Sequence, residues 1–270
     1  MSTLLCTVRS CHLPLVREDR RVVCEREHSF DIARSGYINL LQPQDRHSAN
    51  PGDSAAAVAA RRRFFDRGFD KPIVDGIGGM LSLSAGDEIL DAGCGEGRHL
   101  AAVVDRFGCA GSGVDISLPA IEAAAKRHRG QEWIVANADR FIPFADASFA
   151  AVLSITARMN AGEFRRVLRD GGSLLVVIPA PDDLIELREA ILGEGLQRDR
   201  SDRTIATFAS LFTVERRQRL RAVVHLDHAA IEYALTSSYR GLRRSERSRL
   251  DSIGDADVTL SRDALLFRLL

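Results

Sequence analysis

A glycine-rich turn is the part of this 270-residue sequence best suited to binding a ligand. Residues 88–97 read Glu-Ile-Leu-Asp-Ala-Gly-Cys-Gly-Glu-Gly, which predicts a short buried strand, a tight turn and the start of a helix. Gly93, Gly95 and Gly97 let the backbone approach a ligand closely and adopt angles that other residues avoid. Eighteen residues after Gly97, Asp115 ends a second apolar run. A carboxylate at the end of the neighbouring strand is well placed to hydrogen-bond a ribose.

The spacing within this turn helps to distinguish between nucleotide ligands. A dinucleotide site typically reads G-x-G-x-x-G, and a triphosphate site reads G-x-x-x-x-G-K-[ST]. This turn has neither that third-glycine spacing nor the lysine. Its order, Asp91-x-Gly-x-Gly-x-Gly, resembles motif I of the class I S-adenosylmethionine-dependent methyltransferases. The resemblance implies that S-adenosylmethionine is the cofactor.

The first thirty residues contain three of the five cysteines, Cys6, Cys11 and Cys24. Twelve residues separate Cys11 from Cys24, and Cys24 begins a C-x3-H pattern that ends at His28. Two such pairs around a hairpin-sized gap are typical of a zinc ribbon, and the metal would supply folding energy that so short a segment lacks. We therefore predict a structural Zn²⁺ site formed by Cys6, Cys11, Cys24 and His28. Because four residues separate Cys6 from Cys11, His12 or water is an alternative to Cys6 as the fourth ligand. Incidental buried cysteines without metal are the other alternative.

The overall composition is that of an ordinary globular protein, with 45% hydrophobic and 27% charged residues. No apolar run approaches the roughly 18–20 residues needed to span a bilayer, and the N-terminus lacks a signal-peptide pattern. We expect a cytoplasmic protein without membrane contact. The formal net charge of zero argues against a general basic coat for nucleic acid, although a local patch is compatible with it.

The elements that must position the glycine-rich turn follow from alternating apolar runs and helical patterns. The predicted strands are 88–91, 111–115, 132–136, 150–155 and 173–178. The predicted helices are 97–107, 118–128, 161–168 and 181–192. This alternation predicts an α/β fold with a parallel, doubly wound, Rossmann-like sheet. Residues 218–226 and 264–270 could pair as two further strands at one edge.

The chain divides into three predicted segments. Residues 1–45 form a zinc-binding module, 46–85 a linker and helix, and 86–270 the methyltransferase domain. Residues 43–54 are polar and turn-forming, and Asp53 or Ser54 is expected to cap a helix that runs to about Phe65.

Three further stretches carry a more specific resemblance. They are 28–41 (His-Ser-Phe-Asp-Ile-Ala-Arg-Ser-Gly-Tyr-Ile-Asn-Leu-Leu), 51–54 (Pro-Gly-Asp-Ser) and 60–68 (Ala-Arg-Arg-Arg-Phe-Phe-Asp-Arg-Gly). Together with motif I they resemble the 23S ribosomal RNA guanine-N1 methyltransferases. The resemblance runs from about Cys11 to Pro181 and continues more loosely toward Tyr239-Arg240. It implies an N-terminal zinc module that docks RNA, a class I methyltransferase domain, and methylation of guanine N1 in a 23S rRNA hairpin.

The sequence departs from that family at three places. Four residues rather than two separate Cys6 from Cys11 in the first cysteine pair. Asp70 stands where the family commonly has an aromatic residue near the cofactor. Asp183 stands where the family has a histidine on the cofactor side. These departures concern the cofactor pocket and the substrate rather than the fold.

The resemblance also implies roles for individual residues. The Gly93–Gly97 turn would accommodate the methionine end of the cofactor, and Asp115 would hold the ribose hydroxyls. Glu96 would contact the cofactor or serve as a helix-start carboxylate. Asp139 would bind the adenine amino group or cap a helix, and Asp91 would order the loop or approach the ammonium group.

The catalytic residue is unknown from the sequence. Guanine N1 carries a proton at neutral pH, so methylation needs a proton acceptor. The loop 156–160 and the pair Asp182 and Asp183 lie at the correct end of the sheet, although the two aspartates could equally cap the following helix. We interpret His99 as a helix-surface residue.

Candidate RNA contacts combine arginine with aromatic residues, as suits a hairpin with splayed bases. They are Arg34, Tyr37, the run 61–63 and the arginines between 198 and 221. Two alternatives to 23S rRNA methylation remain open. One is a class I methyltransferase acting on another RNA or a small molecule, and the other is a catalytically inactive zinc-ribbon RNA-binding protein. A homodimer is compatible with the sequence, which does not determine the oligomeric state.

Overall fold

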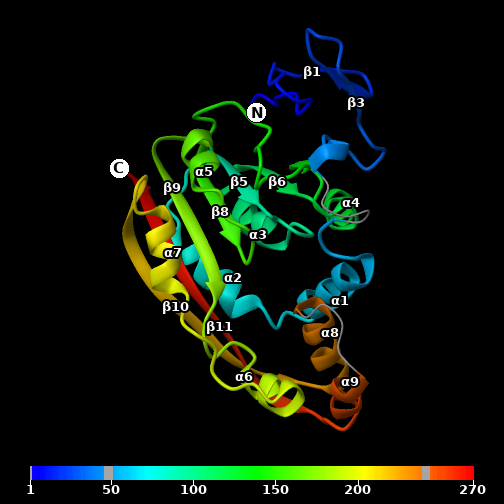
Figure 1. Cartoon of the computed structure of the whole chain (residues 1–270), viewed down its shortest axis with the longest axis vertical. Coiled ribbons are helices and arrows are strands. Elements are labelled where there is room, and N and C mark those ends of the chain that lie inside the picture. The colour runs from blue at the N-terminus through cyan, green and yellow to red at the C-terminus, as the bar shows by residue number, and fades with distance from the viewer. Residues whose placement is uncertain (1, 46–50, 239–243) are drawn as a thin grey trace.

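The computed structural model describes residues 2–45, 51–238 and 244–270 (Figure 1). Two predicted features fall partly or wholly outside these ranges. They are the middle of the linker, at 46–50, and the Tyr239-Arg240 end of the family resemblance. No described helix is both long and apolar enough to cross a membrane.

The core of the fold is an eight-stranded sheet in the order β10-β11-β9-β8-β5-β6-β7-β4. Five strands run parallel in its centre: β5 (Glu88–Ala92), β6 (Ala110–Asp115), β7 (Glu132–Val135), β8 (Phe149–Ile155) and β9 (Leu168–Pro179). The chain builds outward from β5 to β6 and β7, then crosses back to β8 and β9. This order confirms the predicted doubly wound sheet. Its direction reverses between β5 and β8, where open α/β sheets bind their ligands.

Both edges of the sheet carry strands outside this parallel set. β10 (Phe212–Leu226) pairs antiparallel with β11 (Ala256–Leu269), and β11 pairs antiparallel with β9. The two predicted strands do pair, but the alignment differs from the predicted ranges: residues 218–226 align with 256–264, and residues 264–269 align with 212–218. At the other edge, β4 (Ile38–Asn39) pairs parallel with β7. The predicted domain division at residues 45 and 85 stays a prediction, but β4 ties the first segment to the main sheet.

Helices cover both faces of the sheet (Figure 1). The longer ones are α1 (Ala55–Asp66), α2 (Lys71–Met80), α3 (Arg98–Phe107), α4 (Leu118–Arg127), α7 (Ser201–Phe208), α8 (His228–Ser238) and α9 (Arg244–Asp251). The shorter ones are η1 (Pro43–Asp45), α5 (Ala161–Val167), α6 (Ile185–Leu187) and the wider π-type turn η2 (Arg188–Leu192). Ser54 caps α1, because its hydroxyl accepts a hydrogen bond from the Ala57 N–H at 3.2 Å. The helix predicted at 181–192 begins later, at Ile185, because Leu184 has a positive φ of 53°.

Each face of the sheet builds its own apolar core. Along β5, Ile89 and Leu90 are both fully buried but pack into different clusters, as expected when successive strand side chains point to opposite faces. The Leu90 cluster also contains the buried side chains of Cys6, Cys11 and Cys24. The N-terminal residues therefore share a continuous apolar core with the sheet.

The N-terminal module itself is a small three-stranded antiparallel sheet of β1 (Val16–Glu18), β2 (Arg21–Val23) and β3 (Ser29–Asp31). The β1–β2 hairpin fills the gap between Cys11 and Cys24. Leu4 forms an antiparallel bridge with Phe144, and the Leu5 N–H donates to the Pro143 carbonyl at 3.0 Å. Backbone bonds thus attach the module to the loop before β8.

Gly97 allows close packing between the start of α3 and β7. It has a φ of +82°, and a Cβ at this position would lie 2.3 Å from the indole ring of Trp133. We expect Gly97→Ala to lower the free energy of unfolding by about 1–3 kcal/mol through overpacking, beyond the cost of the backbone angle. Gly171→Ala is the matched control, because Gly171 has a φ of +72° and nothing within 4 Å of its added Cβ. Equal losses for both variants in urea denaturation would contradict a packing role.

Candidate active site and metal centre

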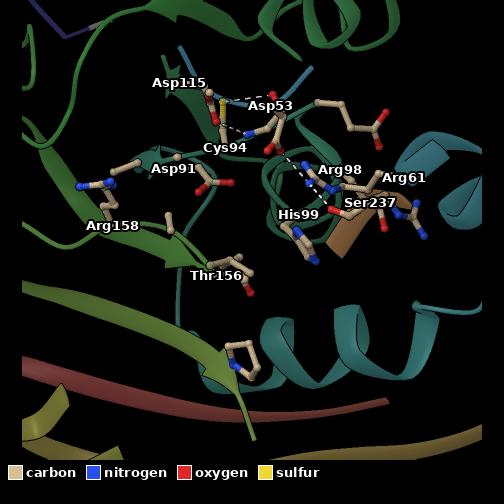
Figure 2. A pocket seen from close by; sticks show the side chains of 18 of the residues that line it. Asp53, Arg61, Asp91, Cys94, Arg98, His99, Asp115, Thr156, Arg158 and Ser237 are labelled. Atoms are coloured by element: carbon tan, nitrogen blue, oxygen red, sulfur yellow. Dashed lines mark hydrogen bonds and ion pairs between the residues drawn. The ribbon is translucent and has the colours of Figure 1, made fainter. Parts of the chain in front are cut away.

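A cavity of about 760 Å³ opens at the carboxyl ends of β5, β6 and β8 (Figure 2). Its floor is the glycine-rich turn that follows β5, and its walls come from the loops after β6, β7 and β8. Residues of α1, α8 and β11 close the remaining side. The cavity therefore sits at the reversal point of the sheet, as the strand order predicts.

The glycine-rich turn adopts the backbone angles that its sequence predicts. Gly93 and Gly95 line the cavity with φ values of +88° and +57°. A Cβ on Gly93 would lie 2.4 Å from the Cβ of Ala157, so the turn also lies directly against the loop after β8. Gly97 does not line the cavity, because it faces Trp133 instead. Two of the three glycines thus face the cavity, and the third positions the helix.

Asp115 lies at the end of β6 and connects two loops at the cavity wall. Its Oδ2 accepts a hydrogen bond from the Gly95 N–H at 2.9 Å, and its Oδ1 accepts one from the Ser117 N–H at 2.8 Å. Burial raises the pKa of the Asp115 carboxyl, and these two N–H donors counteract the rise. The carboxylate is therefore held in one orientation at the edge of the cavity, as its predicted ribose role requires.

Asp91 and Glu96 are buried acids at the floor of the cavity, with exposed fractions of 1% and 3%. Each has one carboxylate oxygen without a hydrogen-bond partner among the described residues. Burial, and secondarily the charge of Asp115, raises the pKa of Asp91 to about 8. Burial raises the pKa of Glu96 to about 7, partly offset by Arg127 and Arg62. Unpartnered buried carboxylates fit a positively charged ligand.

Asp139 lies in the loop after β7 at an exposed rim of the cavity. Its carboxylate is 3.4 Å from the Arg158 guanidinium, and its backbone carbonyl accepts a 2.7 Å hydrogen bond from Asn160. The side chain therefore borders both the β7 and the β8 loops. Asp91, Gly93, Gly95, Glu96, Asp115 and Asp139 all line one cavity.

The two departures from the family inside the cavity carry matched charges. The buried Asp70 carboxylate accepts two hydrogen bonds from Arg98, at 3.0 and 3.3 Å. Asp183 forms an ion pair with Arg262 and accepts a 2.9 Å hydrogen bond from the Ser261 N–H. Each aspartate is therefore neutralised by an arginine from another element.

The interpretation of Asp182 and Asp183 as caps of the following helix is wrong. The structure directs both carboxylates toward the antiparallel strands instead. Asp182 bonds to Arg221 at 3.0 Å, and Asp183 bonds to β11. Residue Leu184 precedes α6, which has no side-chain cap.

The interpretation of His99 as a helix-surface residue is also wrong. His99 lies in the first turn of α3, is half-buried and lines the cavity. Figure 2 shows it on the same side of the cavity as Thr156. The edge of its ring contacts Phe65, with ring centroids 5.8 Å apart. Its position directly after the glycine-rich turn could have indicated from the sequence that His99 lines the cavity.

Arg61, predicted only as one of the candidate RNA contacts, lines the cavity. Its guanidinium is 2.7 Å from the Asp53 carboxylate and donates to the Ser237 carbonyl at 3.0 Å (Figure 2). The Ser117 hydroxyl in turn donates to the Asp53 carbonyl at 2.8 Å. Arg61 thus ties α1 and α8 to the segment that lies over the β6 loop.

Four N-terminal side chains form a metal-ligating cluster, because the ligand atoms of Cys6, Cys11, Cys24 and His28 all lie within 4.8 Å of one another. The Cys11 and Cys24 sulfurs are 3.8 Å apart, and the His28 Nδ1 is 3.4 Å from Cys6 and 3.5 Å from Cys24. Tetrahedral zinc places two sulfurs about 3.8 Å apart and a sulfur and a nitrogen about 3.5 Å apart. His12, the alternative ligand, stacks on Phe141 outside this cluster.

Comparisons with known proteins match both parts of the chain. Residues 5–49 match a zinc-ribbon family described as RlmA, N-terminal, and residues 89–172 match a methyltransferase-domain family. The chain is 38% identical over 227 residues to the 23S rRNA (guanine(748)-N(1))-methyltransferase of Streptomyces fradiae, covering 82% of this chain and 80% of the relative. It is 36% identical over 260 residues to YxjB of Bacillus subtilis (strain 168), covering 92% and 90%, a protein whose name provisionally assigns guanine-N1 methylation of 23S rRNA.

Solved structures match the methyltransferase fold at lower identity. A geranyl diphosphate methyltransferase covers 82% of this chain and 93% of its own, with 18% identity and a TM-score of 0.50. The YcgJ protein of Bacillus subtilis covers 72% of this chain and 95% of its own, with 16% identity and a TM-score of 0.50. At such identities the likeness concerns the fold alone.

Proposed function

Because the chain belongs to the 23S rRNA (guanine-N1-)-methyltransferase family, we propose that it methylates N1 of a guanine in a hairpin of 23S rRNA. It is an S-adenosylmethionine-dependent methyltransferase with a zinc-ribbon module. One observation carries the proposal: the same chain contains the zinc ribbon and a cavity at the reversal point of the sheet, and the ribbon and the sheet share one apolar core.

The residues proposed to hold S-adenosylmethionine follow the walls of the cavity. The backbone at Gly93 and Gly95 lies beside the methionine end, and Asp91 faces its ammonium group from below. Asp115 accepts from the ribose hydroxyls, and Asp139 accepts from the adenine amino group. Glu96 completes the acidic floor, while Gly97 positions α3. The cofactor supplies an electrophilic methyl group on a positively charged sulfur.

The raised pKa of Asp91 predicts a proton linkage to cofactor binding. With its pKa near 8, Asp91 is mostly protonated at pH 7 in the cofactor-free protein. A cationic ligand favours the carboxylate, so binding should release a proton, and affinity should rise between pH 6 and 8. Calorimetry in buffers of different ionisation enthalpy measures this release. Asp91→Asn should abolish it, and an unchanged release in that variant would reject the assignment.

The same shift predicts how the cofactor-free protein responds to pH. Between about pH 4 and 8 the folded state binds more protons at Asp91 than the unfolded chain does, so this group lowers stability as pH rises. Asp91→Asn should therefore raise the melting temperature at pH 7.5 more than at pH 5.

We propose Cys6, Cys11, Cys24 and His28 as the four zinc ligands. The sulfur and nitrogen separations support this set, and three of the four side chains are buried. Burial also raises the pKa of the Cys6 thiol, which a zinc ion would reverse.

The RNA is proposed to run from the zinc-ribbon module to the mouth of the cavity. Arg34 on the module is exposed, and Tyr37 beside it is half-buried. At the cavity mouth the Arg158 side chain is 87% exposed. Arg217 and Arg219 on β10 pair with aspartates, as Arg158 does with Asp139, but their side chains are only 41% exposed, so these two arginines are less available to phosphate. Cytoplasmic location follows from this substrate, and the homodimer stays a prediction.

The two alternative functions lack supporting observations. Catalytic inactivity is disfavoured by the intact turn and by the oriented carboxylate of Asp115. A small-molecule substrate would leave the zinc-ribbon module without a role.

Primer extension on ribosomal RNA tests the proposed function. A methyl group on guanine N1 blocks Watson–Crick pairing, so reverse transcription stops at the modified base. Deleting the gene should remove one stop in a 23S rRNA hairpin, and the gene for the intact protein should restore it. An unchanged stop pattern would reject the proposal.

A further inference from the structure

We propose that His99 is the proton acceptor for methyl transfer, taking the N1 proton of the guanine. The inference rests on the proposed function, since it assigns the base that N1 methylation requires. It starts from the placement of His99 in the cavity, in the first turn of α3, two residues after the glycine-rich turn ends.

The His99 imidazole is open to a substrate. Among the described residues neither ring nitrogen has a hydrogen-bond partner, and neither is sealed from the cavity. The edge contact with Phe65 fixes the ring plane from the α1 side. In Figure 2 the His99 side chain projects from the start of α3 and is seen between the labelled Arg98 and Thr156. A base entering the mouth of the cavity meets this ring beyond the turn that holds the methionine end.

The other acids around the cavity are already engaged. Asp53 pairs with Arg61 and Asp70 with Arg98. Asp183 pairs with Arg262, and Asp139 with Arg158. Each of these carboxylates is held by a guanidinium, so it is not free to contact the N1 proton of a substrate.

The three remaining acids of the lining are Asp91, Glu96 and Asp115, and they lie on the cofactor side. Glu96 is 3% exposed and belongs to the glycine-rich turn. Asp91 is buried beneath the turn, and Asp115 is occupied by the Gly95 and Ser117 N–H groups. His99 is therefore the unengaged base that faces the substrate side of the described cavity.

Burial and the neighbouring positive charges keep the His99 ring neutral. Burial, followed by the positive charges of Arg262, Arg98 and Arg61, lowers its pKa to about 3. These arginines come from β11, α3 and α1, and each is paired with an aspartate. At cellular pH one ring nitrogen thus carries a free lone pair. The arginines also favour the negative charge that develops on a guanine losing its N1 proton.

The step balances in atoms and charge. The N1 lone pair forms the bond to the methyl carbon, the carbon–sulfur bond breaks with its electrons on sulfur, and the N1 proton moves to the imidazole. One positive charge leaves the sulfonium as one appears on the ring, so the charge within the cavity does not increase. The low pKa of His99 then favours release of the proton to solvent, which resets the base.

Single-turnover methylation of a 23S rRNA hairpin by purified full-length protein tests the inference. His99→Ala should slow methyl transfer by about 10²–10⁴-fold, the usual share of general acid–base catalysis. Calorimetry should show unchanged affinities for S-adenosylmethionine and for the hairpin. Added imidazole should partly restore the rate of this variant, which a purely structural role would not allow. His128→Ala is the matched control, because His128 is a half-buried histidine outside the cavity lining.

His99→Gln separates proton transfer from positioning. Glutamine keeps a hydrogen-bonding group and conserves much of the side-chain volume, so this variant should fold and still be slow. If either His99 variant methylates the hairpin at the wild-type rate, the inference is wrong. The proposed function still holds in that case, provided that the digested RNA contains N1-methylguanosine. If wild-type protein forms no N1-methylguanosine, the proposed function fails first and the inference fails with it.

Discussion

Purified Cys24→Ser protein should contain far less than one zinc ion per chain and should lose methylation of ribosomal RNA. Cys24 is buried, and its sulfur is close to both the Cys11 sulfur and the His28 nitrogen. Structural zinc contributes an apparent free energy of roughly 10–16 kcal/mol in small zinc-dependent domains. The three-stranded module is too small to replace this contribution with apolar burial.

The effect should be confined largely to RNA recognition. The residues proposed to hold S-adenosylmethionine lie on the main sheet and in its loops, so calorimetry should show cofactor binding close to that of the wild type. A moderate fall in melting temperature is expected, because the buried cysteines share an apolar core with Leu90 of β5.

Cys109→Ser is the matched control for the zinc experiment. Cys109 is also buried, but it lies just before β6 and outside the metal-ligating cluster. Elemental analysis should find about one zinc ion per chain in this variant. Equal zinc contents in Cys24→Ser and wild-type protein would contradict the ligand assignment.

Asp115→Ala should weaken S-adenosylmethionine binding by about 100-fold or more. A hydrogen bond to a charged group contributes about 1.5–3 kcal/mol, and the proposal gives this carboxylate two ribose hydroxyls. The variant also removes the acceptor of the Gly95 and Ser117 N–H groups, which orient the turn. Isothermal titration calorimetry measures the change, and thermal melting confirms that the variant is folded.

The affinities of Asp115→Asn and Asp139→Ala for S-adenosylmethionine serve as comparisons for that of Asp115→Ala. Asparagine retains one acceptor oxygen but not the charge, so an intermediate affinity is expected. Asp139 lies at an exposed rim and contributes a single proposed contact, so its removal should cost only about tenfold. Wild-type affinity in Asp115→Ala would reject the ribose assignment.

The central sheet was predictable because its strands are nearly continuous apolar runs separated by amphipathic helices. The β5 turn was predictable because positive φ angles restrict the choice of residue to glycine. β10 was harder to delimit, because arginines and other exposed residues hide its pattern over most of its length. α2 contains Gly76, Gly78 and Gly79, which have low helix propensity, so packing must stabilise this helix.

The parts of the site that escaped prediction depend on long-range contacts. Asp183 finds its arginine on β11, and no local pattern links these positions. Because of the longer gap between Cys6 and Cys11, the sequence did not decide whether Cys6, His12 or water is the fourth zinc ligand. In the structure Ser10 and His12 both adopt positive φ angles, so this segment turns back and brings Cys6 to the cluster.

The β4–β7 pairing holds the zinc-ribbon module at a fixed distance from the cavity. Ile38 aligns with Ile134 and Asn39 with Val135, and β7 leads directly into the loop of Asp139. A one-residue slip would turn the fully buried Ile38 away from the core, and a two-residue slip would move the module by about 7 Å. The register of the β4–β7 pairing therefore sets the distance between the metal cluster and the cavity. If the module docks the hairpin as proposed, we expect the enzyme to select a nucleotide at a fixed distance from the docked stem.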